Sequence, residues 1–274
     1  MIIKTLIENT SKSEDLNSEH GLSIYIETRN RKILFDVGAS GLFYENARKM
    51  HVDIPDIDFL IISHGHHDHG GGLRAFLQVN TKAEVFLHRL AFEKYYAHHA
   101  AGEIHFIGLE DELKHERQML PTSDRFFISE GIEVFSNISQ TEPRLVSNDG
   151  LLMEQNGQTV ADSFAHEQNL VVREDGKTLL ATGCAHNGIV NTLKHFYALK
   201  GHMPDYVIGG FHLCSANQGG CADADTIDRI GKYLLDTKAK YYTCHCTGQK
   251  AYGQLKDVMG DRIEYLHTGS EITI

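Results

Sequence analysis

Apolar residues in the first ninety positions occur in short runs, which polar residues and glycines separate. Runs of β-branched and aromatic residues bounded in this way predict strands, and the run IDFLIIS is apolar enough to be buried on both faces. The predicted strands are residues 2–8, 22–28, 32–37, 57–63 and 83–88. Helical patterns lie between them, at about 41–51, 71–79 and 89–98. This alternation of strands and helices predicts an α/β fold.

The rest of the chain divides into two parts. Residues 98–165 are rich in charge and histidine and lack long periodic runs, so we expect an excursion that covers the active-site face. Within it, strands are predicted at 125–129 and 132–136 and a partly helical segment near 110–118. From residue 168 the alternation resumes, with strands at 168–173, 178–182, 205–209, 240–244, 262–267 and 271–274 and helices near 187–200, 223–236 and 248–259. No linker rich in Pro, Gly or Ser divides residues 1–274, which predicts one domain.

Composition narrows the class of protein. The chain has 274 residues, of which 41% are hydrophobic and 23% charged, as in globular proteins. Its net charge of −11 argues against nucleic-acid binding. No apolar run is long enough for a transmembrane helix, so no membrane association is expected. Residues 1–8 lack the pattern of a signal peptide, so we expect a cytoplasmic protein.

The numbers and positions of histidine and cysteine indicate which chemistry the protein can carry out. The 18 histidines are an excess of the commonest metal ligand. The five cysteines are odd in number and confined to the last third of the chain, so we expect reduced thiols rather than a disulfide framework. A separate structural zinc site is disfavoured by the cysteine spacing, which leaves free buried thiols as the prediction for Cys214, Cys221, Cys244 and Cys246.

The strongest chemical signal is the segment 63–72 (SHGHHDHGGG), which directly follows the apolar run 57–63. Burying its histidines and aspartate without metal or partners would cost much desolvation free energy. An exposed loop, in turn, would not require the glycines around it. We therefore interpret residues 63–72 as a metal-binding loop.

The spacing within this loop suits two ions. His64 and His66 project to the same side of an extended segment and can share one ion, whereas Asp68 and His69 lie on the following turn and can face a second. Imidazole and carboxylate ligands suit zinc, with manganese or iron as alternatives. Two such divalent ions would trap a bridging water, lower its pKa and create a nucleophile at neutral pH.

The pattern His-X-His-X-Asp-His after an apolar strand resembles the metallo-β-lactamase superfamily, and this resemblance implies a four-layer αββα sandwich. Asp36, in ILFDVG, matches the aspartate that supports the metal loop in that superfamily. Motifs at three later strand ends, TGCAH (182–186), GGFHL (209–213) and CHCTG (244–248), are similar to one branch of it, which includes a methanogen dihydropterin–ribofuranosylaminobenzene-phosphate synthase.

The resemblance also implies a set of site residues. Six positions match metal ligands: His64, His66, Asp68, His69, His186 and His245. For His186 and His245, the alternative is a histidine that supports the site or contacts the substrate. His212 is either a ligand or a substrate contact, and Asp68 and His212 are the predicted catalytic residues.

For two residues, the sequence leaves two possible roles open. Cys184 occupies the position where most superfamily members place a bridging aspartate, so its thiolate either ligates metal or its side chain packs as a small apolar group. His166 precedes the predicted strand 168–173, and it is either a ligand or a loop histidine that faces solvent.

These observations favour a metal-dependent hydrolase, in which a metal-bound hydroxide attacks a small ester, phosphodiester, lactone or thioester. Asp68 would orient the nucleophile or receive its proton, and the small substrate is expected to be anionic. The branch resemblance implies an alternative, a transferase that joins a pterin-methyl diphosphate to an aminobenzene riboside phosphate. A non-catalytic metal or ligand sensor is a third hypothesis, which the complete ligand set disfavours.

Overall fold

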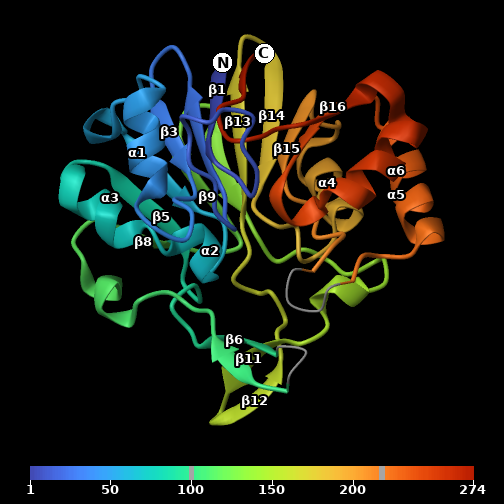
Figure 1. Cartoon of the computed structure of the whole chain (residues 1–274), viewed down its shortest axis with the longest axis horizontal. Helices are drawn as coiled ribbons and strands as arrows, with labels where there is room; N and C mark the ends of the chain where they lie inside the picture. The colour runs from blue at the N-terminus through green and yellow to red at the C-terminus, as the bar shows by residue number, and fades with distance from the viewer. Residues whose placement is uncertain (99–101, 216–219) are drawn as a thin grey trace.

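Two β-sheets pack face to face at the centre of the computed structural model, and helices cover the outer face of each sheet (Figure 1). The structure describes residues 1–98, 102–215 and 220–274. Across these residues, the layers follow the order helix, sheet, sheet, helix, which confirms the predicted αββα sandwich.

The first sheet is built from the N-terminal half of the chain and one C-terminal strand. Its spatial order is β18 (Glu271–Thr273), β1 (Ile2–Ile7), β2 (Ser23–Glu27), β3 (Lys32–Phe35), β4 (Phe59–Ile62), β5 (Glu84–His88) and β8 (Met119–Thr122). The strands β3, β4, β5 and β8 are parallel, whereas β18, β1 and β2 pair antiparallel. Helices α1 (Leu42–Lys49) and α3 (Leu73–Val79) cover its outer face (Figure 1).

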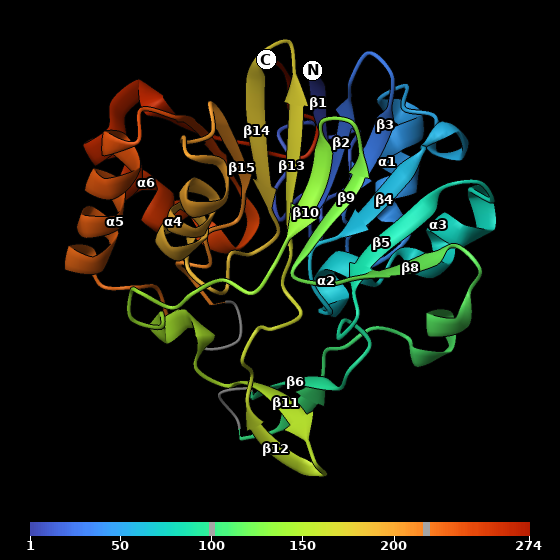
Figure 2. The same ribbon diagram turned by 180° about the vertical axis from the view of Figure 1, so that it is seen from behind.

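The second sheet is built from the C-terminal half. Its spatial order is β17 (Ile263–Tyr265), β16 (Lys240–Thr243), β15 (Tyr206–Gly209), β14 (Lys177–Thr182), β13 (Asn169–Glu174), β10 (Ile132–Phe135) and β9 (Arg125–Ser129). The first four of these strands are parallel. Helices α4 (Ile189–Lys200), α5 (Ala224–Asp236) and α6 (Gln249–Met259) cover its outer face, as the view from behind also shows (Figure 2).

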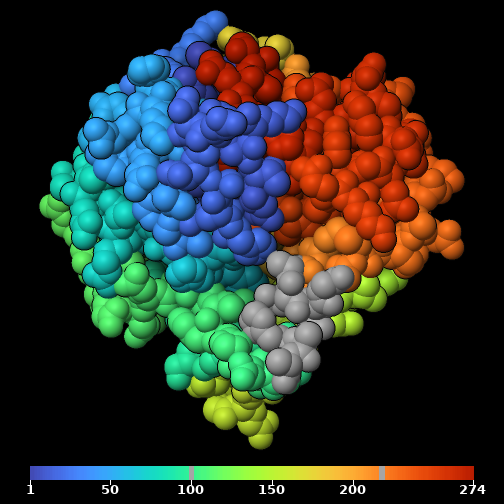
Figure 3. All heavy atoms as spheres, viewed as in Figure 1, coloured from blue at the N-terminus to red at the C-terminus, as the bar shows by residue number. Residues whose placement is uncertain are grey.

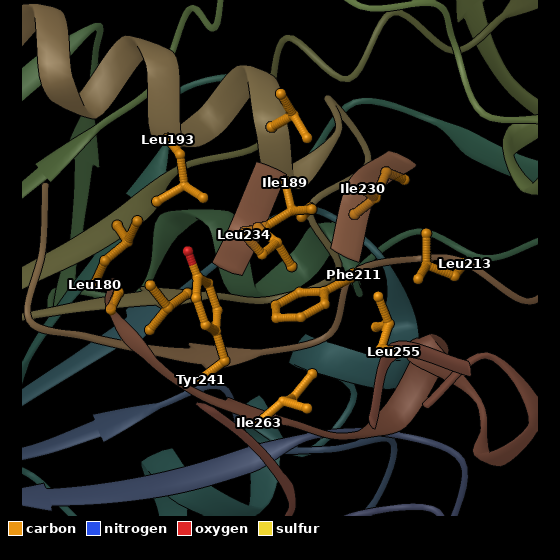
Figure 4. Close-up of a cluster of buried hydrophobic side chains, with 14 of the residues drawn as sticks. Leu180, Ile189, Leu193, Phe211, Leu213, Ile230, Leu234, Tyr241, Leu255 and Ile263 are labelled. Atoms are coloured by element: carbon orange, nitrogen blue, oxygen red, sulfur yellow. The ribbon is translucent and has the colours of Figure 1, made fainter. Parts of the chain in front are cut away.

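Apolar side chains fill the three interfaces between the layers. Ile33, Phe35 and Ile61 of the first sheet meet Leu179 and Ile208 of the second in the central interface. A second cluster lies between the first sheet and its helices, and a third lies between the second sheet and α4, α5 and α6 (Figure 4). Alternation along the strands sends successive side chains to opposite interfaces, which explains why the buried runs are apolar throughout.

A small third sheet lies beyond one edge of the sandwich (Figures 1 and 2). Its order is β12 (Gln158–Ala161), β11 (Leu151–Gln155), β6 (Tyr95–His98) and β7 (Ile104–Phe106). The strands β7, β11 and β12 belong to the segment predicted as an excursion, of which residues 99–101 lie outside the described residues. Short one-turn helices occur at Ile54–Asp56, Asp111–His115, Val146–Asn148, His245–Thr247 and Gly260–Arg262.

The predicted helix at 89–98 is wrong. Residues 95–98 form β6, which pairs with β11 at positions more than fifty residues away in sequence. Tyr95 does not pack a helix: its ring is buried below the strand, and its hydroxyl donates to the Leu90 carbonyl at 2.6 Å. Long-range pairing of two adjacent tyrosines on a strand overrides the local helical propensity.

The prediction of free thiols is wrong for two cysteines. Cys214 and Cys221 form a disulfide, and their Cα atoms are 3.9 Å apart. The backbone brings them together as an antiparallel bridge, in which Ala222 N donates to the Leu213 carbonyl at 2.7 Å. Cys184, Cys244 and Cys246 are free and buried.

The chain termini meet at the end of the sandwich opposite the small sheet (Figure 1), where the Met1 amino group donates to the Ile274 carbonyl at 2.9 Å. On the face that Figure 3 shows, most of the first third of the chain lies on one side and most of the last third on the other, and the C-terminal end lies beside the N-terminal part. Among the described residues, every helix is too short or too polar to cross a bilayer.

Candidate metal centre

The candidate ligands follow the carboxyl ends of strands in both sheets. Asp36 follows β3, and the loop 63–66 with the single-turn helix α2 (His67–Gly70) follows β4. Cys184 follows β14, and His245 follows β16. Because parallel strands end at a common edge, these loops meet at the edge that faces the small sheet (Figure 1).

A cavity of about 290 Å³ opens at this edge. Its lining comes from both sheets and from the small third sheet. The lining residues are His20, Ala39, His66, His67, Asp68, Ile107, Leu151, Cys184, His186, His212, Cys214, Ser215, His245 and Cys246.

The structure brings all six predicted ligands together beside this cavity. In one group, the ligand atoms of Asp68, His69, Cys184 and His245 lie within 4.8 Å of one another. Two further groups with the same spacing are His64 with Cys184 and His186, and His64 with His66 and Asp68. The Cys184 sulfur therefore stands between a position near Asp68 and a position near His186.

Asp36 and Ser63 orient two of the histidines. The Asp36 carboxylate accepts hydrogen bonds from the Ser63 backbone N–H and hydroxyl, each at 2.7 Å, and from His69 Nδ1 at 2.7 Å. Since the Ser63 hydroxyl donates to Asp36, it accepts from His64 Nδ1 at 2.8 Å. The Nε2 lone pairs of both rings consequently point away from these partners, toward the common centre.

Two asparagines orient the other histidines in the same way. His186 Nδ1 donates to Asn148 Oδ1 at 2.9 Å. His245 Nδ1 donates to Asn9 Oδ1 at 2.7 Å, and its Nε2 lies 3.3 Å from Asp68 Oδ2 and 3.2 Å from His69 Nε2. Each hydrogen bond fixes the ring tautomer and leaves Nε2 free to act as a ligand.

The fit to a cation rests on unpartnered nitrogens. Nε2 of His64 and Nε2 of His186 are buried and have no hydrogen-bond partner. Burying such an acceptor without a partner costs free energy. Neighbouring carboxylate, thiol and imidazole groups complete a donor set of the type that holds divalent zinc.

Burial and neighbouring charges set the protonation of the histidines at the site. Burial, together with the nearby His69 and His66, holds the pKa of His64 well below its usual range, so its ring is neutral. Burial also opposes charge on His69, but the adjacent Asp36 and Asp68 outweigh it and raise the pKa of His69 to about 9. A cation bound at this position would take the place of the His69 proton.

Strained backbone shapes the strand ends. Asp36, Ala185, His212 and His245 all have φ between 46° and 60°, although none is glycine. Gly183 is required for a different reason: a Cβ there would lie 2.1 Å from Ser63 Oγ. Left-handed non-glycine residues cluster at functional sites, where the surrounding contacts hold them in place.

Comparison with known proteins identifies the family. The sequence pattern described as the metallo-beta-lactamase superfamily matches residues 17–204. The chain belongs to the metallo-beta-lactamase superfamily. A Methanocaldococcus jannaschii protein named 7,8-dihydropterin-6-methyl-4-(beta-D-ribofuranosyl)-aminobenzene-5'-phosphate synthase is 30% identical, over 93% of this chain and 90% of its own.

Solved structures of the superfamily share the fold. Tm1679, described as a metal-dependent hydrolase of the beta-lactamase superfamily, superposes with a TM-score of 0.85 at 27% identity, covering 100% of this chain and 99% of its own. Zinc-bound PqqB from Methylobacterium extorquens superposes with a TM-score of 0.61 at 12% identity, over the full length of both chains. The family match and the relative named as a synthase confirm the superfamily and branch resemblance inferred from the motifs, and the PqqB match shows the shared fold.

His166 does not face solvent, so that interpretation is wrong. Its ring is buried, and Nδ1 accepts from the Gly65 N–H at 2.9 Å. Nε2 must therefore carry the proton, and it donates to Asp162 Oδ2 at 3.1 Å. The same carboxylate oxygen lies 3.4 Å from His66 Nε2. The ligand atoms of His66, Asp162 and His166 lie within 4.8 Å of one another, so ligation by His166 stays a prediction.

Several site residues carry no local sequence signal. Asn9 and Asn148 lie 236 and 38 positions from the histidines that they orient. His20, in the polar segment before β2, reaches the cavity and places Nε2 3.3 Å from Asp68 Oδ2. An isolated polar residue in a loop has no pattern that distinguishes it from any other, so sequence reasoning missed all three.

Proposed function

We propose that this chain is a metal-dependent hydrolase of small ester-type substrates. The observation that carries the proposal is that two groups of candidate metal ligands share the Cys184 thiol, which lines the cavity. His64, His66 and His186 would hold one divalent cation, and Asp68, His69 and His245 a second. Cys184 would contribute to both.

When bound, the ions supply Lewis acidity and make water nucleophilic at neutral pH. Asp68 is the partly exposed carboxylate of the ligand set, with 23% of its side chain accessible. Its Oδ2 is therefore placed to orient an attacking water or to receive its proton. His212 lines the same cavity and would contact the substrate.

The donor set and the cavity also restrict metal and substrate. A thiolate between imidazoles favours zinc or iron over manganese, because sulfur is the softer ligand. Ile107, Leu151 and Ala39 give one part of the lining an apolar character, and its described residues include neither Lys nor Arg. A substrate with one negative charge, such as a phosphodiester, could be held by the ions alone.

A second candidate function is the transferase that the resemblance to the synthase branch implies, and the relative named as a synthase supports it. That reaction would require a pterin-methyl diphosphate and an aminobenzene riboside phosphate in one site. A cavity of about 290 Å³ is near the lower limit for a single small-molecule ligand. It also has no described cationic side chain for a diphosphate. Both observations favour hydrolysis of a smaller substrate.

The test is turnover of an activated phosphodiester by protein loaded with zinc or manganese. Wild type should hydrolyse it, and Asp68→Ala should not. His67→Gln is the matched control for metal content, because His67 lies in the same loop, is exposed and belongs to none of the ligand groups. It should retain both ions.

Three results would change the conclusion. Equal turnover by wild type and Asp68→Ala would refute the assigned role of Asp68. Two bound ions without turnover would overturn the hydrolase proposal, and formation of the pterin product from its two precursors would then establish the transferase. Metal binding without either reaction would support the sensor hypothesis.

A further inference from the structure

A cluster of two thiols and one imidazole lies beside the proposed two-ion centre. The Cys184 and Cys246 sulfurs and a ring nitrogen of His212 are within 4.8 Å of one another. All three side chains are buried, with residue exposures of 2%, 7% and 7%. All three also line the cavity.

The imidazole is oriented as a ligand. His212 Nε2 lies 3.0 Å from the Ser147 carbonyl oxygen, which can only accept, so Nε2 carries the proton. Nδ1 therefore has the lone pair, and it is buried without a hydrogen-bond partner. Ser147 also donates its hydroxyl to the His212 carbonyl. Two contacts with one residue thus hold His212 in its left-handed conformation (φ 46°) with Nδ1 unpartnered.

The backbone leaves room for the second sulfur. A Cβ on Gly210 would lie 2.5 Å from Cys246 Sγ and 2.9 Å from the Gly183 carbonyl oxygen. The Cys246 thiol lies 3.7 Å from the Cys184 carbonyl oxygen, and the Cys184 sulfur lies 3.1 Å from His69 Nε2. Two buried sulfurs and the unpartnered His212 Nδ1 therefore form a compact set of soft donor atoms.

We infer that Cys184, Cys246 and His212 form a further position for a soft divalent cation, Zn²⁺ in the native protein. Two thiolates and one imidazole suit zinc, and three protein ligands leave a fourth position open to the cavity. The inference shares Cys184 with the proposed two-ion centre, and the Cys184 thiolate would link this position to the other two. It also makes His212, which the proposed function assigns to substrate contact, a ligand of the additional ion.

Cadmium binding tests the inference without relying on turnover. Protein handled without oxygen or added thiol is titrated with Cd²⁺, and the thiolate-to-cadmium absorption and the bound ions per chain are measured. Cys246→Ser should bind one ion fewer per chain and lose a large part of the absorption. Cys244→Ser is the matched control, because Cys244 is a free buried thiol in the core between the sheets and belongs to no ligand group.

His212→Gln provides a second variant if Cys246→Ser does not fold. It keeps both thiols and removes the nitrogen, so its affinity for the additional ion should fall by about a hundredfold, since even losing a residue that merely supports a ligand costs about 10–100-fold. Unchanged stoichiometry and absorption in Cys246→Ser would overturn the inference, as would cadmium binding by wild type without thiolate absorption. A wild-type protein that lacks hydrolysis but shows the Cys246-dependent absorption would refute only the proposed function.

Discussion

The substitution Asn148→Ala tests whether His186 is a metal ligand. Asn148 is fully buried and makes two hydrogen bonds with His186: Oδ1 accepts from Nδ1 at 2.9 Å, and Nδ2 donates to the His186 carbonyl at 2.8 Å. Alanine removes both partners without touching the ligand itself. The ring then loses the contact that keeps Nε2 free and directed at the centre.

The expected magnitudes follow from these two contacts. Two buried polar groups left without partners, at about 1–3 kcal/mol each, should lower the free energy of unfolding of the metal-free protein by about 2–6 kcal/mol. Loss of a residue that orients a ligand should weaken metal affinity by about 10–100-fold, which equals about 1.4–2.8 kcal/mol. At saturating zinc, the stabilisation that the ion provides should fall by that same amount.

The assay combines zinc titration calorimetry with urea unfolding in the presence and absence of zinc. Asn191→Ala is the matched control. Asn191 is buried as well, its Nδ2 donates to the Asn187 carbonyl at 2.8 Å, and its Oδ1 accepts from the backbone N–H groups of residues 141 and 142, which lie outside the candidate ligand set. It should lose stability but keep its zinc affinity. Asn148→Asp, which keeps an acceptor for His186 Nδ1, should recover part of the affinity. If Asn148→Ala binds zinc as tightly as wild type, His186 is not a ligand.

Three further predictions concern the loop, the core and pH. Gly183→Ala should weaken zinc binding, measured by calorimetry, by at least about tenfold. The new Cβ would lie 2.1 Å from Ser63 Oγ and would displace the side chain that orients His64. An unchanged zinc affinity would contradict this prediction. Leu193→Ala should cost about 2–5 kcal/mol in urea unfolding, whereas Tyr197→Ala, exposed on the same helix, should cost under about 0.5 kcal/mol; equal costs would refute the assigned packing. Burial lowers the pKa of His88 from 6.5 to about 4 in the folded protein. As the pH falls from 6.5 to 4, His88 becomes protonated in the unfolded chain before it does in the folded protein, so the free energy of unfolding should fall over this range. His88→Gln should flatten this dependence in urea unfolding at several pH values, and an unchanged slope would contradict it.

Local pattern was enough to predict most of the framework. The strands β4 and β14 follow from short apolar runs, because a strand buried on both faces requires apolar residues throughout. The helix α5 follows from its apolar periodicity, and Asp223 caps it by accepting from Thr226 N at 2.8 Å. In each case, the physical cause acts over a few neighbouring residues.

Pairing between distant segments was not predictable in this way. The sequence pattern predicted a helix that included residues 95–98. These residues instead form β6, because their backbone hydrogen bonds are made with β11. The sequence predicted free thiols for Cys214 and Cys221, but these residues form a disulfide, because residues 213–215 pair with residues 220–222. Such outcomes depend on contacts that no local pattern encodes.

The sequence by itself determined the alternation of strands and helices and the histidine loop at a strand end, since periodicity and clustered ligands act through adjacent residues. The αββα sandwich was implied by the resemblance to the superfamily. Only the tertiary structure decided which donors converge. Parallel strands carried Cys184 and His245 to the edge where the loop of His64 lies. Asn9 and Asn148 then set the tautomers of their histidines across long sequence separations. Metal ligation requires donor atoms to meet within a few ångströms, and that geometry exists only after the two sheets have packed.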